Sequence, residues 1–329
     1  MRETNWGIIG PGNIAHDFAR DLRLIPVLQQ ITAVMSHNNK SVDKFAREFN
    51  IPDSYTDFNE FLKNKTIDVV YIATPHPHHF KQSLACLENN IPVLCEKPMT
   101  INADQSQKLI SAAQTHKTFL MEGMWIRFLP SIQQVLSIIK EGRIGHIVSI
   151  KASMCYKAPH DPNSRYFDPA LGGGSLLDLG IYPVFLAHLL LGKPDTIKAV
   201  GTLSNEGVDE ACSVLFHYKT GQQAILESSL LVQTDIPAEI TGEKGIIKIL
   251  DPWYEKSKGI ELHEYNEEKI IYPCAWEGHG LQYEAQEVLN CIQQNKIESE
   301  TLSHAFSLEM IKTMDEIRSQ IHVTYDMYE

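Results

Sequence analysis

The sequence predicts an α/β fold of two domains, with a parallel sheet in the first and an open, mainly antiparallel sheet in the second. Short apolar runs alternate with helical patterns over roughly the first 120 residues. A glycine-rich turn, Gly10-Pro11-Gly12, follows the first of these runs. Later β-prone runs are joined by turns too short for crossover helices, which favours antiparallel pairing. Because 329 residues exceed what one core usually holds, we expect domains at residues 1–122 and 123–329.

The N-terminal domain is expected to consist of βαβ units. Apolar, β-branched runs predict strands at residues 6–9, 31–36, 66–73, 92–95 and 118–121. Apolar residues at helical spacing predict helices at residues 14–22, 42–49, 80–88 and 103–115. Elements that alternate at this length form a parallel sheet with helices on its faces.

The C-terminal domain is expected to combine several helices with one larger sheet. Helices are predicted at residues 131–140, 175–191, 280–293 and 304–321. Strands are predicted at residues 146–156, 197–203, 211–218, 223–231, 236–241, 245–250, 259–264 and 269–272.

Charge and composition exclude several classes of partner. The chain has 41 acidic against 29 basic residues, a formal charge of −12, which opposes binding to nucleic acid. A local basic pocket for one phosphate is still compatible with this charge. The six cysteines form no CxxC pair, so we expect buried, reduced thiols.

No targeting or membrane-spanning segment is expected. The chain runs from Met1 almost at once into an apolar strand, which leaves no room for a signal peptide. The longest apolar stretch, residues 171–192, is interrupted by Asp178 and Pro183 and makes a poor membrane span. We therefore expect a cytoplasmic protein without a membrane partner.

Residues 10–15 form a G-x-G-x-x-A fingerprint between the first strand and the first helix. Gly10 permits a tight turn, Gly12 lets the backbone approach a pyrophosphate, and Ala15 allows close packing of helix on strand. The helix N-terminus, at Asn13 and Ile14, supplies amide donors and positive partial charge to phosphates. The motif therefore predicts a Rossmann domain that binds a dinucleotide.

The end of the second strand bears on the form of the cofactor. An Asp or Glu at this point usually binds the ribose 2′-hydroxyl of NAD, and neither follows Val34 here. Ser36, His37 and Lys40 tolerate or favour a 2′-phosphate instead. We therefore favour NADP(H), with NAD(H) as an alternative. A solvated loop, with the adenosine contacts elsewhere, is the other interpretation.

Three segments are expected at the carboxyl edge of the parallel strands, where open α/β sheets bind ligands. Lys97 follows a buried strand and precedes Pro98, so its ammonium is a catalytic candidate; a surface lysine before a turn is the alternative. The cluster at residues 76–79 lacks the spacing of a zinc site, so we expect no metal, and histidines that cap the next helix or contact ribose. The cofactor-binding candidates at this edge are Thr74, Pro75, His76, His79, Glu96, Lys97, Trp125 and Arg127.

Residues 172–183 carry the clearest chemistry of the second domain. Asp178 and Tyr182 are four residues apart and share one helix face, which is otherwise apolar. A carboxylate there needs a partner or a ligand. An Asp held at a helix N-terminus, or a Tyr with a satisfied hydroxyl, explains either residue alone. Lys97, Asp178 and Tyr182 are the catalytic candidates, and with Trp125 they are the candidates for binding substrate.

Three motifs together resemble those of one enzyme family. Residues 10–15, Glu96-Lys97-Pro98 and residues 172–182 are similar, in the same order, to motifs of the glucose–fructose oxidoreductase/inositol dehydrogenase (Gfo/Idh/MocA) family. The resemblance covers essentially the whole chain and is greatest to the dihydrodiol- and xylose-oxidising branch. Many members have histidine at the position of Tyr182. NADP-linked relatives commonly carry arginine where this chain has His37.

The resemblance implies an NAD(P)-dependent dehydrogenase or reductase acting on a hydroxyl or carbonyl carbon of a sugar, polyol or trans-dihydrodiol. It implies Tyr182 as general acid/base, Lys97 as its electrostatic partner and Asp178 as a group that orients substrate or Lys97. Trp253 or Trp276 are further candidates for the pocket wall. It also implies a homodimer formed through the open face of the C-terminal sheet.

Two other hypotheses stay open at this point. One is a related reductase of another substrate class, such as an inositol, an anhydro-sugar or a biliverdin-like acceptor. The other is a non-catalytic NADP(H)-binding regulator built on the same fold.

Overall fold

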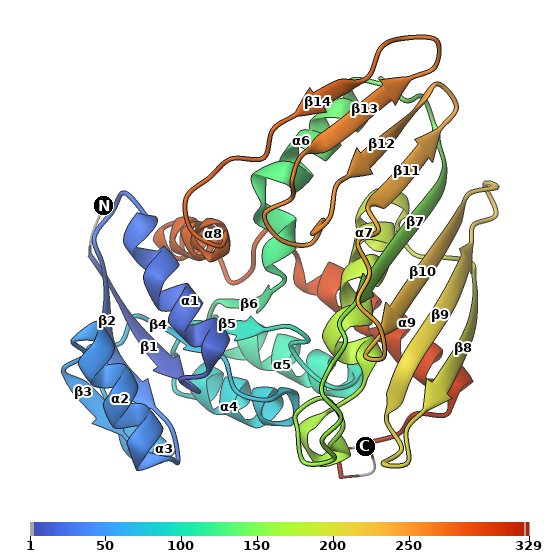
Figure 1. Ribbon diagram of the computed structural model, residues 1–329. Helices are drawn as coiled ribbons and strands as arrows, with labels where there is room; N and C mark the ends of the chain where they lie inside the picture. Colours follow the sequence, from blue (N-terminus) through green and yellow to red (C-terminus); the bar gives the residue numbers. More distant parts are fainter. Residues whose placement is uncertain (1–2, 326, 329) are drawn as a thin grey trace. The chain divides into compact units, whose positions relative to one another are not determined.

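The computed structural model describes residues 3–325 and 327–328, and the chain divides into two compact units (Figure 1). Unit 1 comprises Met1–Trp125 and Glu277–Leu308, and unit 2 comprises Ile126–Trp276 and Glu309–Glu329. The expected single boundary after residue 122 therefore differs from the structure, in which residues 277–308 return to the first unit.

Unit 1 is built on a six-stranded parallel sheet in the order β3-β2-β1-β4-β5-β6. Strands β4, β5 and β6 are buried along their whole length, as expected for a parallel sheet that is covered on both faces. The predicted Rossmann architecture is confirmed, with an additional short edge strand, β3, that has no apolar run of its own. The strands are β1 (Thr4–Ile9), β2 (Gln29–Met35), β3 (Asp53–Tyr55), β4 (Val69–Ile72), β5 (Val93–Glu96) and β6 (Leu120–Gly123).

The helices of unit 1 begin where local capping permits. Asn38 caps α2 by accepting hydrogen bonds from the backbone of Lys40 and Ser41. Helix α4 begins at His76, four residues before the predicted start, because Pro77 lies in the first helical turn, where no backbone N–H is needed. The histidine cluster is therefore helical and not part of a loop. The helices are α1 (Asn13–Asp21), η1 (Leu22–Leu24), α2 (Asn39–Phe49), α3 (Phe58–Leu62), α4 (His76–Glu88), α5 (Ala103–His116) and α8 (Leu281–Gln293).

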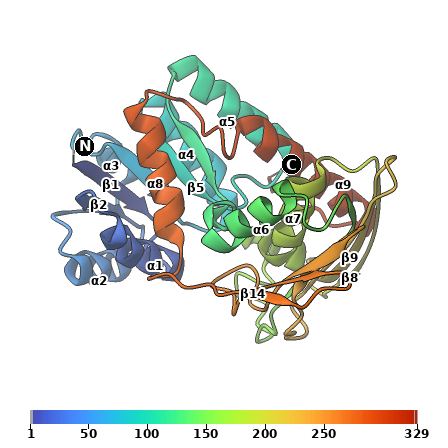
Figure 2. The ribbon, with the colours of Figure 1, turned by 90° about the horizontal axis from the view of Figure 1, so that it is seen from above.

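A buried carboxylate explains why the later segment belongs to unit 1. Asp21, the last residue of α1, accepts hydrogen bonds of 2.8–3.0 Å from the backbone N–H groups of His279, Gly280 and Leu281. Its negative charge thereby caps the positive end of α8. Helix α8 packs beside α1 (Figure 2). These contacts join positions about 260 residues apart, so no local sequence pattern predicts them.

Unit 2 holds an eight-stranded sheet in the order β14-β13-β12-β11-β7-β10-β9-β8. All neighbouring pairs are antiparallel except β7 and β10, which run parallel. The predicted open, mainly antiparallel sheet is confirmed. The strands are β7 (Ile147–Cys155), β8 (Thr196–Leu203), β9 (Asp209–His217), β10 (Gln223–Ser229), β11 (Ala238–Gly242), β12 (Gly245–Ile249), β13 (Ile260–Glu264) and β14 (Ile270–Tyr272).

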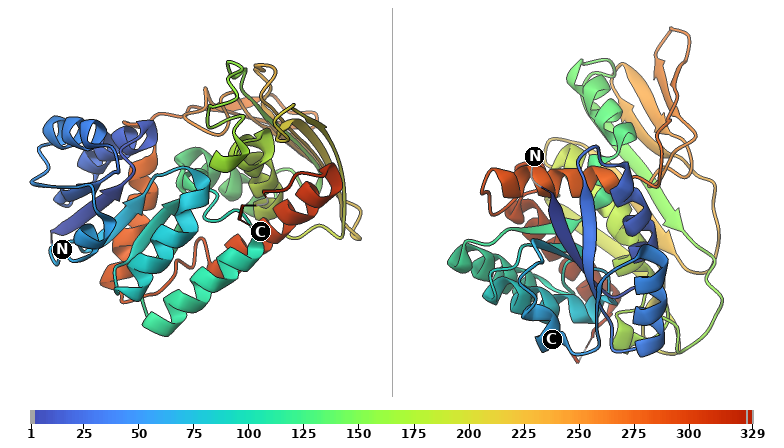
Figure 3. Two further views of the ribbon diagram at one scale, coloured as in Figure 1. Left: turned by 90° about the horizontal axis from the view of Figure 1, so that it is seen from below. Right: turned by 90° about the vertical axis from the view of Figure 1, so that its left-hand side faces the viewer.

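Helices cover one face of this sheet (Figure 3). Helix α7 packs on β7 and β10. The last turns of α9 lie along β8, where the Gln320 amide accepts from Ala199 N at 2.9 Å and donates to Ile197 O at 3.1 Å. On the opposite face the alternating side chains of β8, β9 and β10 are exposed. The helical segments are η2 (Trp125–Phe128), α6 (Pro130–Lys140), η3 (Pro169–Leu171), η4 (Leu176–Gly180), α7 (Ile181–Leu191) and α9 (His304–Ile321).

The apolar stretch that precedes and includes α7 belongs to a protein core. Among the described residues, Pro169–Leu191 is long and apolar enough to cross a membrane by length and composition. However, 83% of its most apolar window is buried within the protein, as in a core helix. The helix predicted at residues 175–191 begins with η4, which is a π-helix and not the regular α-helix that the sequence predicts.

Candidate active site

The turn between β1 and α1 leaves room for a ligand at one glycine only. Gly10 has a φ of +88°, and an added Cβ would lie 2.7 Å from the Thr74 side chain, so the protein itself requires glycine there. At Gly12 an added Cβ would find no protein atom nearer than the Ala73 carbonyl oxygen, at 4.0 Å. Protein packing therefore gives no reason for glycine at this second position, whereas close approach of a pyrophosphate does.

The N-terminus of α1 has the properties of an anion site. No side chain caps it, and Gly12 is its N-cap residue. The first-turn amides, at Asn13 and Ile14, have no partner within the helix by geometry and carry positive partial charge. The His16 ring is held beside this turn, with Nδ1 2.7 Å from the Gly12 carbonyl oxygen. The residues present thus fit the diphosphate of a dinucleotide.

Two histidines and a lysine lie near the end of β2. The pKa of His78 is lowered by burial and, to a smaller extent, by the nearby His37 and Lys81. His37 itself is exposed, while the Ser36 hydroxyl accepts a hydrogen bond from Asn38 N at 3.2 Å. His78 belongs to the histidine cluster at residues 76–79 that the sequence shows, but its proximity to His37 depends on how α4 packs and was not predicted. An imidazole pair beside an ammonium suits a 2′-phosphate.

His79 connects two of the predicted segments. It is fully buried, with Nε2 2.7 Å from Thr74 O and Nδ1 2.8 Å from Pro98 O. Burial lowers its pKa to about 4, while the two carbonyl groups act in the opposite direction because they favour the protonated ring. These contacts fix the loop around Pro75 against the turn that carries Lys97.

Lys97 lies at the carboxyl edge of the sheet, directly after β5, and its peptide bond to Pro98 is cis. The preceding carboxylate, Glu96, accepts hydrogen bonds from the Tyr71 hydroxyl at 2.5 Å and from Lys97 N at 3.1 Å. Burial raises the pKa of Glu122 on β6, and the Lys97 charge opposes that rise. The ammonium therefore lies in the field of the Glu122 carboxyl group on the neighbouring strand.

Asp178 and Tyr182 are placed by a change of helix type. Asp178 lies in the π-helical η4, and Tyr182 is the second residue of α7. Both are buried, at 7% and 5% exposure, and the other described side chains at residues 176–187 are apolar or absent. A π-turn has more residues per turn than an α-helix, so residues four apart are well aligned on one face. Short π-helical segments recur at functional sites.

Two residues of unit 2 join this pair without having been predicted. Arg165 contacts both oxygens of Asp178, at 3.3 and 3.2 Å. The ring of Tyr254 lies 6.1 Å, centroid to centroid, from that of Tyr182. Its neighbour Trp253, a predicted wall residue, is fully buried and donates from Nε1 to Ser153 O, so it belongs to the core. Arg165 and Tyr254 both lie on loops, where the spacing of residues in the sequence does not predict which side chains meet.

The structure therefore gathers the predicted residues in two groups. In unit 1, Thr74, His79, Glu96 and Lys97 lie along the carboxyl edge of the sheet. In unit 2, Asp178 and Tyr182 form the second group. Trp125 and Arg127 share η2, with Trp125 in unit 1 and Arg127 in unit 2.

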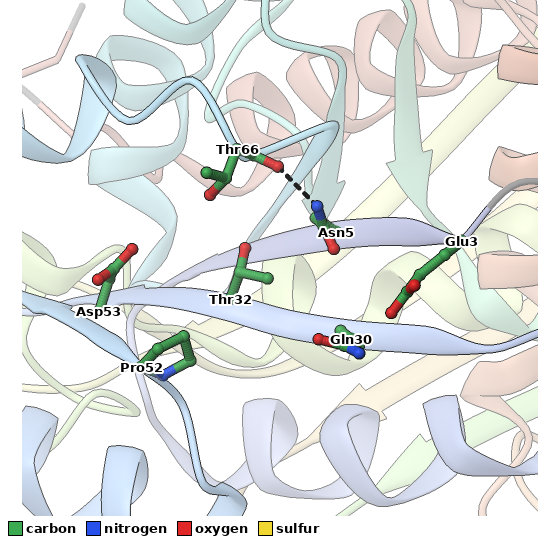
Figure 4. A pocket seen from close by; sticks show the side chains of 7 residues that line it. All are labelled: Glu3, Asn5, Gln30, Thr32, Pro52, Asp53 and Thr66. Carbon is green, nitrogen blue, oxygen red and sulfur yellow. Dashed lines mark hydrogen bonds between the residues drawn. The ribbon is translucent and has the colours of Figure 1, made fainter.

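A polar hollow elsewhere in unit 1 does not coincide with this chemistry. It measures about 560 Å³ and is lined by residues at or near the amino ends of β1, β2 and β3 (Figure 4), whereas Gly10 and Lys97 follow the carboxyl ends of β1 and β5. Asn5 Nδ2 donates to Thr66 O across it at 3.0 Å. Within the described part of the chain, no three His, Cys, Asp or Glu side chains gather as metal ligands would. The lining residues are Glu3, Asn5, Gln30, Thr32, Pro52, Asp53 and Thr66.

Comparison with known proteins covers nearly the whole chain. A family model for oxidoreductases with an NAD-binding Rossmann fold matches residues 4–124, and the GFO/IDH/MocA C-terminal domain matches residues 132–248. The trans-1,2-dihydrobenzene-1,2-diol dehydrogenase of Xenopus tropicalis is 35% identical, over 98% of this chain and 99% of that protein.

Solved structures share the same fold. Levoglucosan dehydrogenase, in complex with NADH and levoglucosan, superposes with a TM-score of 0.86 at 20% identity over 98% of each chain. A 3-ketoreductase from Actinomadura kijaniata, in complex with NADP and TDP-benzene, gives 0.86 at 22% identity over 97% of this chain and 98% of its own. Together with the sequence matches, these findings show that the chain belongs to the Gfo/Idh/MocA family of NAD(P)-dependent oxidoreductases.

Proposed function

We propose that this protein is an NADP(H)-favouring dehydrogenase or reductase that acts on a hydroxyl or carbonyl carbon of a sugar, polyol or trans-dihydrodiol. Its family and its 35% identity to a protein named as a dihydrodiol dehydrogenase support this substrate class. Lys97, Tyr182 and Asp178 carry the reaction in this proposal. A cytoplasmic location belongs to the same proposal.

The observation that carries the proposal is the Asp178–Tyr182 pair. Both side chains are buried on a helical segment that is otherwise apolar, where a carboxylate and a phenol hydroxyl need polar partners or a ligand. A core helix without chemistry has no reason to keep a carboxylate and a phenol on one face.

The chemistry divides between the cofactor and the protein. The bound nicotinamide supplies hydride transfer at its C4. Tyr182 takes the proton from the substrate hydroxyl during oxidation and returns it during reduction. Because a tyrosine ordinarily has a pKa of about 10, a neighbouring cation is needed to favour phenolate near neutral pH. Lys97 supplies that cation, and Asp178 accepts a hydrogen bond from the substrate.

Two substitutions test the assigned roles. Tyr182→Phe should lower kcat by about 100- to 10,000-fold, because it removes the acid/base group, while NADPH binding measured by fluorescence titration is unchanged. Lys97→Met should lower kcat for oxidation and move the acidic limb of its pH–rate profile to higher pH, because the Tyr182 phenolate loses its neighbouring cation. Tyr265→Phe is the matched control, because it removes a hydroxyl that donates to Gly242 O outside this site, and its turnover should be close to that of the wild type. Unchanged turnover in the Tyr182 variant excludes its role.

A substrate panel tests the reaction class. Aldoses, polyols, trans-diols and an anhydro-sugar are assayed in parallel with NADP⁺ and NAD⁺ by absorbance of the reduced cofactor. Turnover of at least one vicinal diol or aldose is expected. NADP(H) binding without turnover of any compound would favour the regulator hypothesis.

The open face of the unit 2 sheet supports a homodimer. Val200 is 76% exposed, and Leu215 and Ile225, which face each other across β9 and β10, are 41% and 50% exposed. A row of exposed apolar side chains on a sheet face is typical of a subunit interface. Ile225→Glu should therefore yield monomers by light scattering, whereas Leu28→Glu, an exposed leucine of unit 1, should not. A wild-type monomer would contradict the dimer.

A further inference from the structure

Arg165 and Asp178 form a side-on ion pair within unit 2. Nη1 of Arg165 donates to Oδ1 of Asp178 at 3.3 Å, and Nη2 lies 3.2 Å from Oδ2. The two nitrogens thus face the two oxygens in the fork arrangement of an arginine–carboxylate pair. Both distances exceed the 2.7–2.9 Å or so of a tight pair, so the pair is loose.

The two partners differ in their access to solvent. The Asp178 side chain is 9% exposed and the Arg165 side chain 52%. A buried carboxylate stays ionised only beside a cation or strong donors. Burial lowers the pKa of Arg165, but the charge of Asp178 and the contacts with Tyr166 together raise it above its ordinary value, so the guanidinium stays charged. Asp178 is therefore held as an anion that accepts hydrogen bonds.

The loop that carries Arg165 is fixed by its own packing. The guanidinium stacks 4.3 Å from the Tyr166 ring centroid and donates to the Tyr166 hydroxyl at 3.0 Å. Gly174 N donates to Tyr166 O at 2.8 Å, and an added Cβ at Gly173 would lie 2.7 Å from the same oxygen. Such close approach holds Arg165 in place before any substrate arrives.

We propose that the Arg165–Asp178 pair forms hydrogen bonds with the substrate hydroxyl next to the one that Tyr182 deprotonates. The enzyme would thereby select vicinal diols. A hydroxyl is both a donor and an acceptor, and this pair presents a carboxylate acceptor beside a guanidinium donor. An alkyl carbon at that position satisfies neither partner and leaves both without the hydrogen bonds they made to water. Asp178 and Tyr182 are four residues apart on one helical face, so the pair lies beside the acid/base group, as recognition of two neighbouring substrate hydroxyls requires.

The inference rests on the proposed function and names its substrate class. Arg165 acts here as a specificity residue, and Tyr182 keeps the acid/base role. The two ideas fail in different ways, because loss of Tyr182 affects every substrate whereas loss of Arg165 affects diols alone.

The test compares trans-cyclohexane-1,2-diol with cyclohexanol, using NADP⁺ and three proteins. Wild-type kcat/KM should be at least about tenfold higher for the diol. Arg165→Met should lower kcat/KM for the diol by about 10- to 100-fold, mainly through KM, and change that for cyclohexanol less than about twofold. Arg143→Met is the matched control because it breaks a comparable pair with Glu264 in the same unit.

A second experiment measures alcohol binding directly, so its result does not depend on turnover. In the Tyr182→Phe background, loaded with NADP⁺, the Kd of each alcohol is measured by ligand-observed NMR with and without Arg165→Met. The double variant should lose the preference for the diol, while NADPH affinity and Tm stay at the values of the Tyr182→Phe protein. Equal losses for both alcohols, or a diol preference that survives Arg165→Met, would overturn the inference.

Discussion

Gly12 faces the Ala73 carbonyl oxygen across the first turn with space for a methyl group: an added Cβ would lie 4.0 Å from that oxygen. Two residues earlier the same addition at Gly10 would collide with Thr74 at 2.7 Å, on a backbone with φ of +88°. The two glycines of one motif therefore differ in what they serve. Packing requires glycine at Gly10 but not at Gly12, and we propose that Gly12 serves the ligand.

This difference predicts opposite phenotypes for two alanine variants. Gly12→Ala should leave Tm within about 2 °C of the wild type and weaken NADPH binding at least tenfold or so, because the methyl group occupies the diphosphate position. Gly10→Ala should lower Tm, because it combines a steric clash with a left-handed backbone. Thermal unfolding and fluorescence titration measure both effects. Wild-type NADPH affinity in Gly12→Ala would mean that no dinucleotide binds at this turn.

A buried carboxyl group near Glu96 predicts a pH dependence of stability. Glu284 on α8 is fully buried, and neither of its oxygens has a hydrogen-bond partner among the described residues. Burial, followed by the charges of Glu96 and Asp21, raises its pKa well above 4.5. Folding therefore makes this group hold its proton more tightly than the unfolded chain does.

The sign of the effect follows from proton linkage. Above the unfolded pKa, unfolding releases this proton, so the Glu284 contribution lowers the free energy of unfolding as pH rises, until the folded pKa is passed. In Glu284→Gln this loss is absent. The stability of the variant relative to the wild type should thus grow from pH 5 to pH 8, by at most about 1.4 kcal/mol per unit.

Urea unfolding at four pH values checks this prediction. Glu287→Gln is the matched control, since Glu287 lies one turn along the same helix and accepts a hydrogen bond from Ser299. Its stability difference from the wild type should stay constant across the series. A constant difference for Glu284→Gln as well would show that Glu284 ionises freely in the folded protein.

The cap that joins α1 to α8 predicts a large stability effect at Asp21. Asp21→Ala leaves the buried amide of Leu281 without its acceptor, while Gly280 N keeps only Gln282 Oε1, and the change should cost about 2–3 kcal/mol. Asp57→Ala, which removes a local and exposed cap from α3, should cost about 1 kcal/mol or less. Chemical denaturation compares the two. Equal losses would show that the long-range cap contributes no more than a local one.

The charge at residue 37 should set cofactor preference. His37→Arg places a permanent cation near His78 and Lys81 and should tighten NADPH binding by about tenfold, with NADH little changed. His37→Asp should weaken NADPH and improve NADH, because a carboxylate repels the 2′-phosphate and accepts from a 2′-hydroxyl. The ratio of the two Kd values is the measurement. A ratio insensitive to both substitutions would place the adenosine contacts elsewhere.

Periodicity and local motifs account for most of the architecture. The runs around Val69 and Val93 are apolar throughout, as strands buried on both faces require, and they appear as β4 and β5. The fingerprint at residues 10–15 predicts the first turn because glycine, alanine and a helix start are needed within one short segment. The edge strand β3 shows no such pattern because an edge strand buries little and needs no apolar run.

The candidate site is predictable only where chemistry and sequence neighbourhood coincide. Lys97 and Tyr182 stand out because each is a reactive side chain inside an apolar segment. Arg165 and Tyr254 do not, since they approach Asp178 and Tyr182 from loops whose course no spacing rule specifies.

The sequence by itself therefore determined the order and type of the helices and strands, the presence of a dinucleotide-binding fingerprint and the resemblance to the family. These depend on interactions within about 15 residues, which composition and period record directly. Only the tertiary structure decided that residues 277–308 return to the first unit, that η4 is π-helical, and that Arg165 pairs with Asp178. The first and the last of these outcomes depend on the carboxylates of Asp21 and Asp178, whose hydrogen-bond donors lie far along the chain or on a loop. Burial, and not a local sequence pattern, selects such partners.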